Sequence, residues 1–380
     1  MAETEKKLKI DAYALRAYTM LAALVVIWLF FHWQTAGVFL TPRNLSNLML
    51  QTSVTGIIAT GMLMVIISGN IDLSVGSLLA LAGCAAAITL TDYGWGIFLV
   101  IAVAIVIGTG IGFFQGFLTA YGRIPAFIVT LGGLLGWRGA TKWISKSETI
   151  PVTDETFKAI GQQYVDPRVG WILAAIAVFA ILFFAFRRAK TKKEYGIGDG
   201  STGKEMIGSV PAVLGILIFI FVMNSYAGIP IPVMIFLAIA IFGYFITNYT
   251  TFGRYVYAIG GNAEAAKLSG INNKMVVLKV FGLLGAFVGI ASVIYTARVS
   301  SATPDAGTLL ELDAIAACVI GGTSLMGGRG TVFGACLGAL IMASLDNGMS
   351  LLNLPDFMQE IIKGTILVAA VGLDMVGRKD

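Results

Sequence analysis

Seven polar residues within or beside long apolar stretches are the side chains of this chain that could do chemistry. They are Asn70, Asp72, Ser77, Asp313, Thr323, Ser324 and Asn347. Polar groups inside membrane-spanning segments are costly, and they often line a route for water, ions or polar solutes. Their amide, hydroxyl and carboxylate groups can exchange hydrogen bonds with a solute that passes. We therefore take these residues as candidates to line an aqueous pathway.

Each polar cluster also has a purely structural interpretation. Asp72 or Ser74 could cap the helix that follows, and capping alone would explain both residues. For Asn70 the sequence favours neither interpretation. Glycine pairs around Thr323 and Ser324 favour an unwound backbone, which membrane proteins tolerate only where it faces protein or water. The alternative there is a tight helix crossing that requires small residues.

The third cluster is the run Asp346-Asn347-Gly348. Its aspartate most simply bonds to a neighbouring backbone group, to Asn47 or to Gln51.

Several kinds of site are excluded by residue type and spacing. His32 is the single histidine, and the three cysteines lie in apolar segments without a CxxC spacing. We therefore expect no catalytic site, no metal site and no cofactor. The run 198–205 resembles a phosphate-binding loop, but Glu205 stands where that loop needs Ser or Thr. No nucleotide site is expected in this chain.

A polar segment over 250–270 lies between two apolar runs and contains signals for a short helix. Asn262 can cap its first N–H groups, Glu264 favours its positive end, and Gly270 supplies a left-handed stop. Good helix formers lie between them, which predicts a helix over 263–269. Such a helix outside the bilayer would suit a binding partner; the alternative is a connector without a partner.

Composition determines the class of protein. Of 380 residues, 57% are hydrophobic and 12% are charged, with a mean hydropathy of +0.86. Soluble domains are typically about 45–50% apolar and 25% charged. We therefore predict an all-α polytopic membrane protein whose residues 1–380 form a single transmembrane domain.

Apolar runs of roughly 20 residues predict ten to twelve spans. Their ranges are 18–40, 51–68, 73–91, 95–120, 125–144, 168–186, 207–226, 230–248, 276–298, 312–326, 331–350 and 357–376. The runs 51–68 and 312–326 are short and interrupted by glycine, so either could be a broken or re-entrant helix. The first run is interpreted as a retained span and not as a signal peptide.

Basic residues near the span ends predict the orientation. Lysines before the first span place the N-terminus in the cytoplasm, and twelve spans then place the C-terminus there too. The two largest basic segments, a loop at 187–206 and the segment 249–275, fall on the same side. The net charge of +5 is therefore a topology signal and does not indicate nucleic-acid binding.

Five ordered blocks carry a resemblance to a known family. They cover 51–57, 69–77, 252–262, 268–271 and 311–325. These blocks resemble the permease subunits of bacterial monosaccharide ABC importers, over about 40–150 and 228–377. The segment 168–226 departs from the ribose type by an added pair of spans and is similar to xylose or multiple-monosaccharide permeases.

The resemblance implies a fold like that of type II importer permeases, and it implies several partners. Two copies of such a permease form the pathway, ATP-binding subunits dock from the cytoplasm, and a periplasmic or lipid-anchored sugar-binding protein delivers a monosaccharide. That protein would dock around 145–167 and 299–311, and the pathway would work by alternating access. The implied location is the bacterial inner membrane, and the sugar stays open among xylose, arabinose, glucose and galactose.

In such importers a cytoplasmic coupling helix sits in a groove of the ATP-binding subunit, and the resemblance assigns this role to the segment from Gly253 to Gly270. The coupling residues that it implies are Gly253, Arg254, Asn262, Glu264, Ala265, Ala266, Leu268 and Gly270. Residues 264–270 also match an EAA-x-x-x-G pattern of importer coupling loops.

Two other classes compete with this interpretation. An ion-coupled secondary sugar transporter usually needs paired intramembrane acids, whereas Asp72, Asp313 and Asp346 are scattered in sequence. A membrane enzyme acting on lipid-linked sugars would need a nucleophile with a base or a metal cluster, and neither pattern is present.

Overall fold

The structure is a computed structural model that describes residues 12–195 and 202–376. Within these ranges it has fifteen helices and four two-residue strands. The helices are α1 (Ala12–Gln34), α2 (Pro42–Ile67), α3 (Val75–Thr91), α4 (Ile97–Ala120), α5 (Ala126–Ile144), α6 (Glu155–Gln162), α7 (Pro167–Glu194), α8 (Thr202–Asn224), α9 (Ile231–Tyr249), α10 (Thr251–Gly261), α11 (Ala263–Leu268), α12 (Asn273–Val299), α13 (Leu310–Ile320), α14 (Val332–Leu351) and α15 (Asp356–Val376). The strands are β1 (Ile150–Pro151), β2 (Tyr164–Val165), β3 (Ile229–Pro230) and β4 (Ser301–Ala302).

Helix α2 is the centre of the bundle and packs against α9, α12, α13 and α14. Thr41 caps its N-terminus, Pro42 starts its first turn, and the helix continues unbroken to Ile67. The expectation of a possible break at 51–68 is therefore wrong. Hydroxyl groups inside the helix are satisfied locally: Thr60 Oγ1, for example, donates to Gly56 O at 2.8 Å. Such backbone bonding lets polar residues remain in a buried helix.

Glycines bring helices α4 and α12 into close contact. A Cβ atom at Gly108 would lie 2.2 Å from Gly285 O, and one at Gly112 would lie 2.3 Å from Phe281 O. Close backbone approach through small residues is how membrane helices gain packing energy without a hydrophobic driving force. The two helices are therefore fixed together along several turns.

Helices α3 and α13 are short because irregular backbone replaces part of each span. Helix α13 has only 11 residues, and the chain unwinds after Ile320 through Gly322, Gly327 and Gly328, all with positive φ. The expectation of a broken helix at 312–326 is confirmed. Residues 68–74 form the corresponding non-helical stretch before α3.

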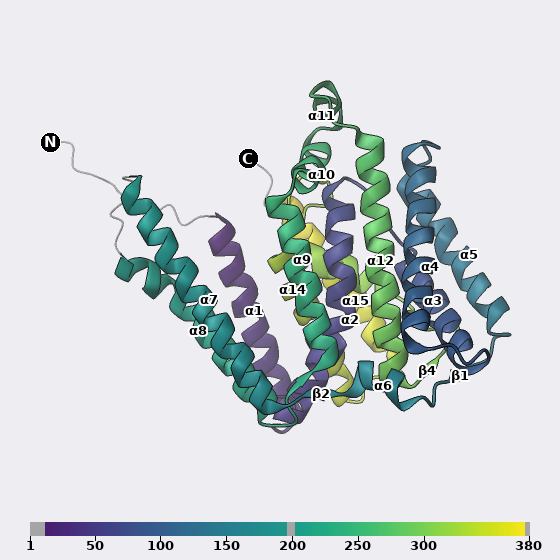
Figure 1. Ribbon diagram of the computed structural model, residues 1–380, viewed down its shortest axis with the longest axis horizontal. Helices are drawn as coiled ribbons and strands as arrows, with labels where there is room; N and C mark the ends of the chain where they lie inside the picture. The colour runs from purple at the N-terminus through teal and green to yellow at the C-terminus, as the bar shows by residue number, and fades with distance from the viewer. Residues whose placement is uncertain (1–11, 196–201, 377–380) are drawn as a thin grey trace.

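Helices α7 and α8 form a peripheral pair (Figure 1). Only 17% and 11% of their most apolar windows are buried, because they pack mainly against each other. Helix α7 extends to Glu194 and α8 begins at Thr202, so most of the predicted loop at 187–206 is helical instead. Residues 196–201, which hold much of the phosphate-loop-like run, lie outside the described ranges.

The two ends of the bundle differ (Figure 1). Helix α11 protrudes at one end, where the described part of α1 also begins. The strands and α6 cover the other end, where β1 pairs with β4 and β2 with β3, both antiparallel. By length and composition, seven of the described helices could cross a membrane. The chain is therefore a multi-pass membrane protein.

Candidate functional site

A polar cavity of about 200 Å³ lies among α2, α12, α13 and α14. Its polar lining consists of Gln51, Thr55, Tyr295, Arg298, Asp313, Asp346 and Ser350. The cavity lies toward the end that carries the strands, because Gln162 of α6 donates to Arg298 O at 3.1 Å. Amide, hydroxyl, carboxylate and guanidinium groups together offer both donors and acceptors, which suits a neutral polyhydroxy solute.

Three charges meet beside this cavity. Lys363 Nζ of α15 lies 3.2 Å from Asp313 Oδ2 and 2.8 Å from Asp346 Oδ1. The three side chains are mostly shielded, and two carboxylates share one ammonium group. The expectation that Asp346 bonds to a neighbouring backbone group, to Asn47 or to Gln51 is wrong. A lysine inside the last apolar run was the sequence signal for this cluster.

Asn347 joins two helices and does not line the cavity. Its Oδ1 accepts a hydrogen bond from Asn44 Nδ2 at 2.8 Å, and the same nitrogen donates to Phe39 O at 2.8 Å. Both asparagines are buried. The pair ties α14 to the first turn of α2, and the sequence analysis had not identified Asn44.

Local hydrogen bonds account for most of the cluster at 68–77. Asp72 is buried, and its Oδ1 accepts from the N–H and from Oγ of Ser74, both at 2.7 Å. Ser74 in turn receives a hydrogen bond from Gln115 Nε2 of α4 at 2.8 Å. Ser77 donates to Ser74 O at 2.8 Å, and half-buried Asn70 donates to Ser68 Oγ at 3.0 Å. Asp72 thus closes a turn before α3, and no side chain caps this helix, so the expectation that Asp72 or Ser74 caps it is wrong. The role of Asp72 in a pathway stays a prediction.

Thr323 and Ser324 lie in the unwound segment after α13. Ser324 Oγ accepts a hydrogen bond from the N–H of Met326 at 3.2 Å. Thr323 is fully buried, and its Oγ1 has no hydrogen-bond partner among the described residues. A buried polar atom without a partner is costly, and the role of Thr323 and Ser324 in a pathway stays a prediction.

The short helix predicted at 263–269 is present as α11. Asn262 Oδ1 accepts from the N–H of Ala265 at 2.9 Å, and Gly270 has the left-handed φ of +86°. Ala266 is 4% exposed and faces the protein, whereas Leu268 is 89% exposed. Leu268 therefore lies at the surface of the protein, and its role in coupling stays a prediction.

The remaining predicted coupling residues divide into two groups. Arg254 of α10 and Glu264 of α11 are exposed. These two helices lie at the same end of the molecule (Figure 1). Gly253 is buried at the start of α10, where a Cβ atom would lie 2.3 Å from Ile246 O. The first group could contact a partner, and the second fixes α10 against α9.

Helix α10, which the sequence analysis missed, connects α11 to the core. A Cβ atom at Gly260 would lie 1.6 Å from Ile67 O at the end of α2. Gly328 N donates to the same Ile67 O at 2.9 Å, and Tyr257 OH donates to Gly330 O at 2.7 Å. Helix α10 therefore contacts both the central helix and the unwound segment.

Comparison with known proteins assigns the family. A family model described as the permease component of the branched-chain amino acid transport system matches residues 44–371. This chain belongs to that permease family.

Named relatives cover nearly all of the permease. The xylose transport system permease protein of Escherichia coli K12 is 44% identical over 96% of this chain and 93% of its own length. The protein of the same name from Haemophilus influenzae is 44% identical over 98% of this chain and 99% of its own. The ribose import permease protein of Escherichia coli K12 is 36% identical over 88% of this chain and 87% of its own. No solved structure matches the permease significantly.

Proposed function

We propose that this permease forms the translocation pathway of an ATP-driven monosaccharide importer. The observation that carries the proposal is the exposed, capped helix α11, linked through α10 to α2 and to the unwound segment. A displacement of this helix by a partner would therefore be passed through α10 to the core. The full-length similarity to xylose and ribose permeases supports the same function.

The proposed partners bind opposite ends of the bundle. An ATP-binding subunit would dock on α11, at the end with the basic residues Arg123, Arg254, Lys267 and Lys274, where Lys274 lies 5.3 Å from the Tyr121 ring. Basic residues favour the cytoplasmic side, so this end would face the cytoplasm of a bacterial inner membrane. We also propose that a second copy of the permease completes the pathway.

A sugar-binding protein would dock at the other end. The two segments predicted for this contact, 145–167 and 299–311, are joined there by the β1–β4 pairing. Gln162 strengthens the join through bonds to Ala297 O and Ser300 Oγ at 3.1 and 2.7 Å. Docking on this surface would therefore act on α12 and α13 together.

The proposed cycle is alternating access. ATP binding in the partner would displace α11, and α10 would carry the displacement to Ile67 and to Gly330. The unwound segment can move without breaking a helix, since its backbone is already irregular. A partner changes the equilibrium only by its different affinity for the two states, so the sugar itself need not bind tightly.

For the substrate we propose xylose or a related pentose or hexose. The relatives with the higher identity are named for xylose, and the cavity between α2 and α14 has polar groups for hydroxyl recognition. The family description mentions branched-chain amino acids, so the substrate assay includes leucine beside the sugars.

One observation favours a second candidate, an ion-coupled secondary transporter. Asp313 and Asp346 are scattered in sequence, but the structure brings both onto Lys363 beside the cavity. Clusters of this kind can bind or relay protons in transporters.

The deciding experiment uses proteoliposomes that contain the permease with its co-purified ATPase, and the sugar-binding protein is supplied together with the sugar. The expected result is xylose uptake that requires ATP on the side of the vesicle where the ATPase lies. This uptake should continue without an ion gradient. Uptake that follows a proton or sodium gradient in the absence of ATP would establish the second candidate instead. Leucine uptake without sugar uptake would overturn the proposed substrate class.

A further inference from the structure

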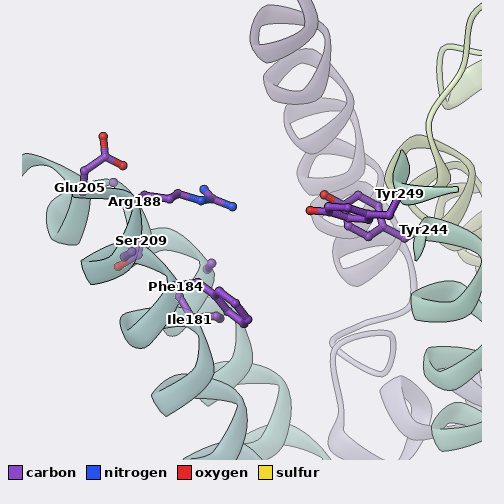
Figure 2. A pocket seen from close by; sticks show the side chains of 10 residues that line it. Ile181, Phe184, Arg188, Glu205, Ser209, Tyr244 and Tyr249 are labelled. Atoms are coloured by element: carbon purple, nitrogen blue, oxygen red, sulfur yellow. The ribbon is translucent and has the colours of Figure 1, made fainter. Parts of the chain in front are cut away.

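A second cavity lies between the outer helix pair α7–α8 and helix α9 (Figure 2). Its volume is about 670 Å³, and it takes no part in the pathway described above. Apolar side chains of α7, including Ile181 and Phe184, form one wall, and Gly208 and Ala212 of α8 leave room beside them. Tyr244 and Tyr249 of α9 form the opposite wall.

Hydrogen-bond donors gather at one end of this cavity. Figure 2 shows the side chain of Arg188 and the hydroxyl ends of Tyr244 and Tyr249 pointing toward one another across it. The two tyrosine rings pack edge to face, with centroids 5.9 Å apart. Guanidinium and phenol groups that converge in this way suit the oxygen atoms of an anion.

The positive charge of Arg188 is not neutralised by a carboxylate of the described residues. Glu205, which also lines the cavity, forms an ion pair with Lys192, and Lys190 lies 3.8 Å from Glu194. The last turns of α7, over 187–194, carry five basic residues and one acidic residue. The site therefore has an unbalanced positive charge.

The cavity lies where an apolar span meets a basic cluster. The apolar part of α7 ends at Phe186, and Arg187 and Arg188 follow at once. This transition marks the boundary between hydrocarbon and lipid headgroups, where basic residues attract anionic lipids. Phe184 of the lining is largely exposed, and the exposed Phe245 stacks on the Tyr249 ring. The ligand must therefore be an amphiphile with an anionic head.

We propose that this cavity binds one anionic glycerophospholipid of the surrounding leaflet. Arg188 and the hydroxyls of Tyr244 and Tyr249 bind its phosphate. Its acyl chains follow the apolar wall between α7–α8 and α9. The lipid then fills the space between a weakly buried helix pair and the core, and it fixes that pair at its position.

The test measures phospholipid retention by native mass spectrometry of the full-length permease, exchanged into detergent with phosphatidylglycerol or phosphatidylethanolamine. We expect one retained phosphatidylglycerol in preference to phosphatidylethanolamine. Arg188→Gln should lower this retention about fivefold, the factor that corresponds to roughly 1 kcal/mol per basic residue at a membrane surface. Tyr244→Phe should lower it less, because the ring remains.

Arg187→Gln is the matched control. Arg187 precedes Arg188 in the chain, but its guanidinium lies over the Phe183 ring at 5.9 Å and is not part of the cavity lining. The control should retain phosphatidylglycerol as the unmodified chain does. Equal losses in both arginine variants, or no loss in either, would overturn the proposal.

Two further experiments test other occupants of the cavity. If inorganic phosphate alone stabilises the permease against heat as well as phosphatidylglycerol does, and loses this effect in Arg188→Gln, the site binds free phosphate and not lipid. If Ser209→Cys, placed in the cavity wall, cross-links to a second copy in lipid membranes, the cavity is an interface between copies. Either result would refute the lipid site.

Discussion

Adding one methyl group at Gly260 should uncouple α10 from the core. In Gly260→Ala the new Cβ atom would lie 1.6 Å from Ile67 O and 2.6 Å from Gly328 N. Carbon and oxygen atoms normally stay about 3.3 Å apart, so α10 and the end of α2 must separate by roughly 1.7 Å. Both contacts are to backbone atoms, and no side-chain rotation relieves them.

The expected cost combines two effects. Overpacking of this kind costs about 1–3 kcal/mol, and weakening the 2.9 Å bond from Gly328 N to Ile67 O adds about 1 kcal/mol. We therefore expect a loss of about 2–4 kcal/mol in the free energy of the native packing. Two assays follow from this: thermal unfolding of the purified permease, and sugar uptake per ATP hydrolysed in proteoliposomes. The melting temperature and the sugar uptake per ATP should both fall. The ATP-binding partner should stay bound, because α11 is unchanged.

Gly261→Ala is the control on the same helix. A Cβ atom at Gly261 would meet nothing within 4 Å, and alanine favours a helix over glycine by about 0.5–1 kcal/mol. This variant should keep uptake and melt at the same or a higher temperature. If the Gly260 and Gly261 variants behave alike in both assays, the coupling route through α10 is refuted.

Three other substitutions test separate parts of the structure. Lys363→Met leaves Asp313 and Asp346 without their cation, so we expect the free energy of unfolding to fall by about 3–5 kcal/mol. The melting temperature and the amount of folded protein in the membrane should both fall. An unchanged melting temperature would argue against the ion cluster. Asn262→Ala removes the cap of α11 at a cost of about 1 kcal/mol, and it should weaken capture of the ATPase while Asn262→Ser keeps it. Gly285→Ala brings a Cβ atom to 2.1 Å from a backbone oxygen of α4 and should lower the melting temperature. An unchanged melting temperature would contradict this close contact.

Local signals predicted α11 well. The cap residue Asn262, the helix formers and Gly270 all lie within nine positions, and each acts on its immediate neighbours. The same holds for the break after α13, which depends on a run of glycines. Helix α10 was missed because its signals are weak: it contains three glycines, and its stability comes from contacts to Ile67 and Gly330.

The polar residues of the candidate pathway could be listed from the sequence, but their bonding partners and their places in the bundle could not be predicted from it. Asp313 and Lys363 are 50 positions apart, and Asn44 and Asn347 are 303 apart. Their pairing depends on which helices are neighbours. Apolar residues cover nearly all sides of helices such as α4, so no stripe in the sequence shows how each is rotated.

The sequence by itself determined that this is a multi-span helical membrane protein, where most spans lie, and that a capped helix stands outside them. The bilayer imposes these features, because each crossing segment must satisfy its own backbone hydrogen bonds and be apolar over a fixed length. Only the tertiary structure decided which polar side chains meet at Lys363, which face the cavity, and how α10 contacts Ile67. These depend on helix rotation and on backbone approach at single glycines, and both are set by packing between segments distant in the chain.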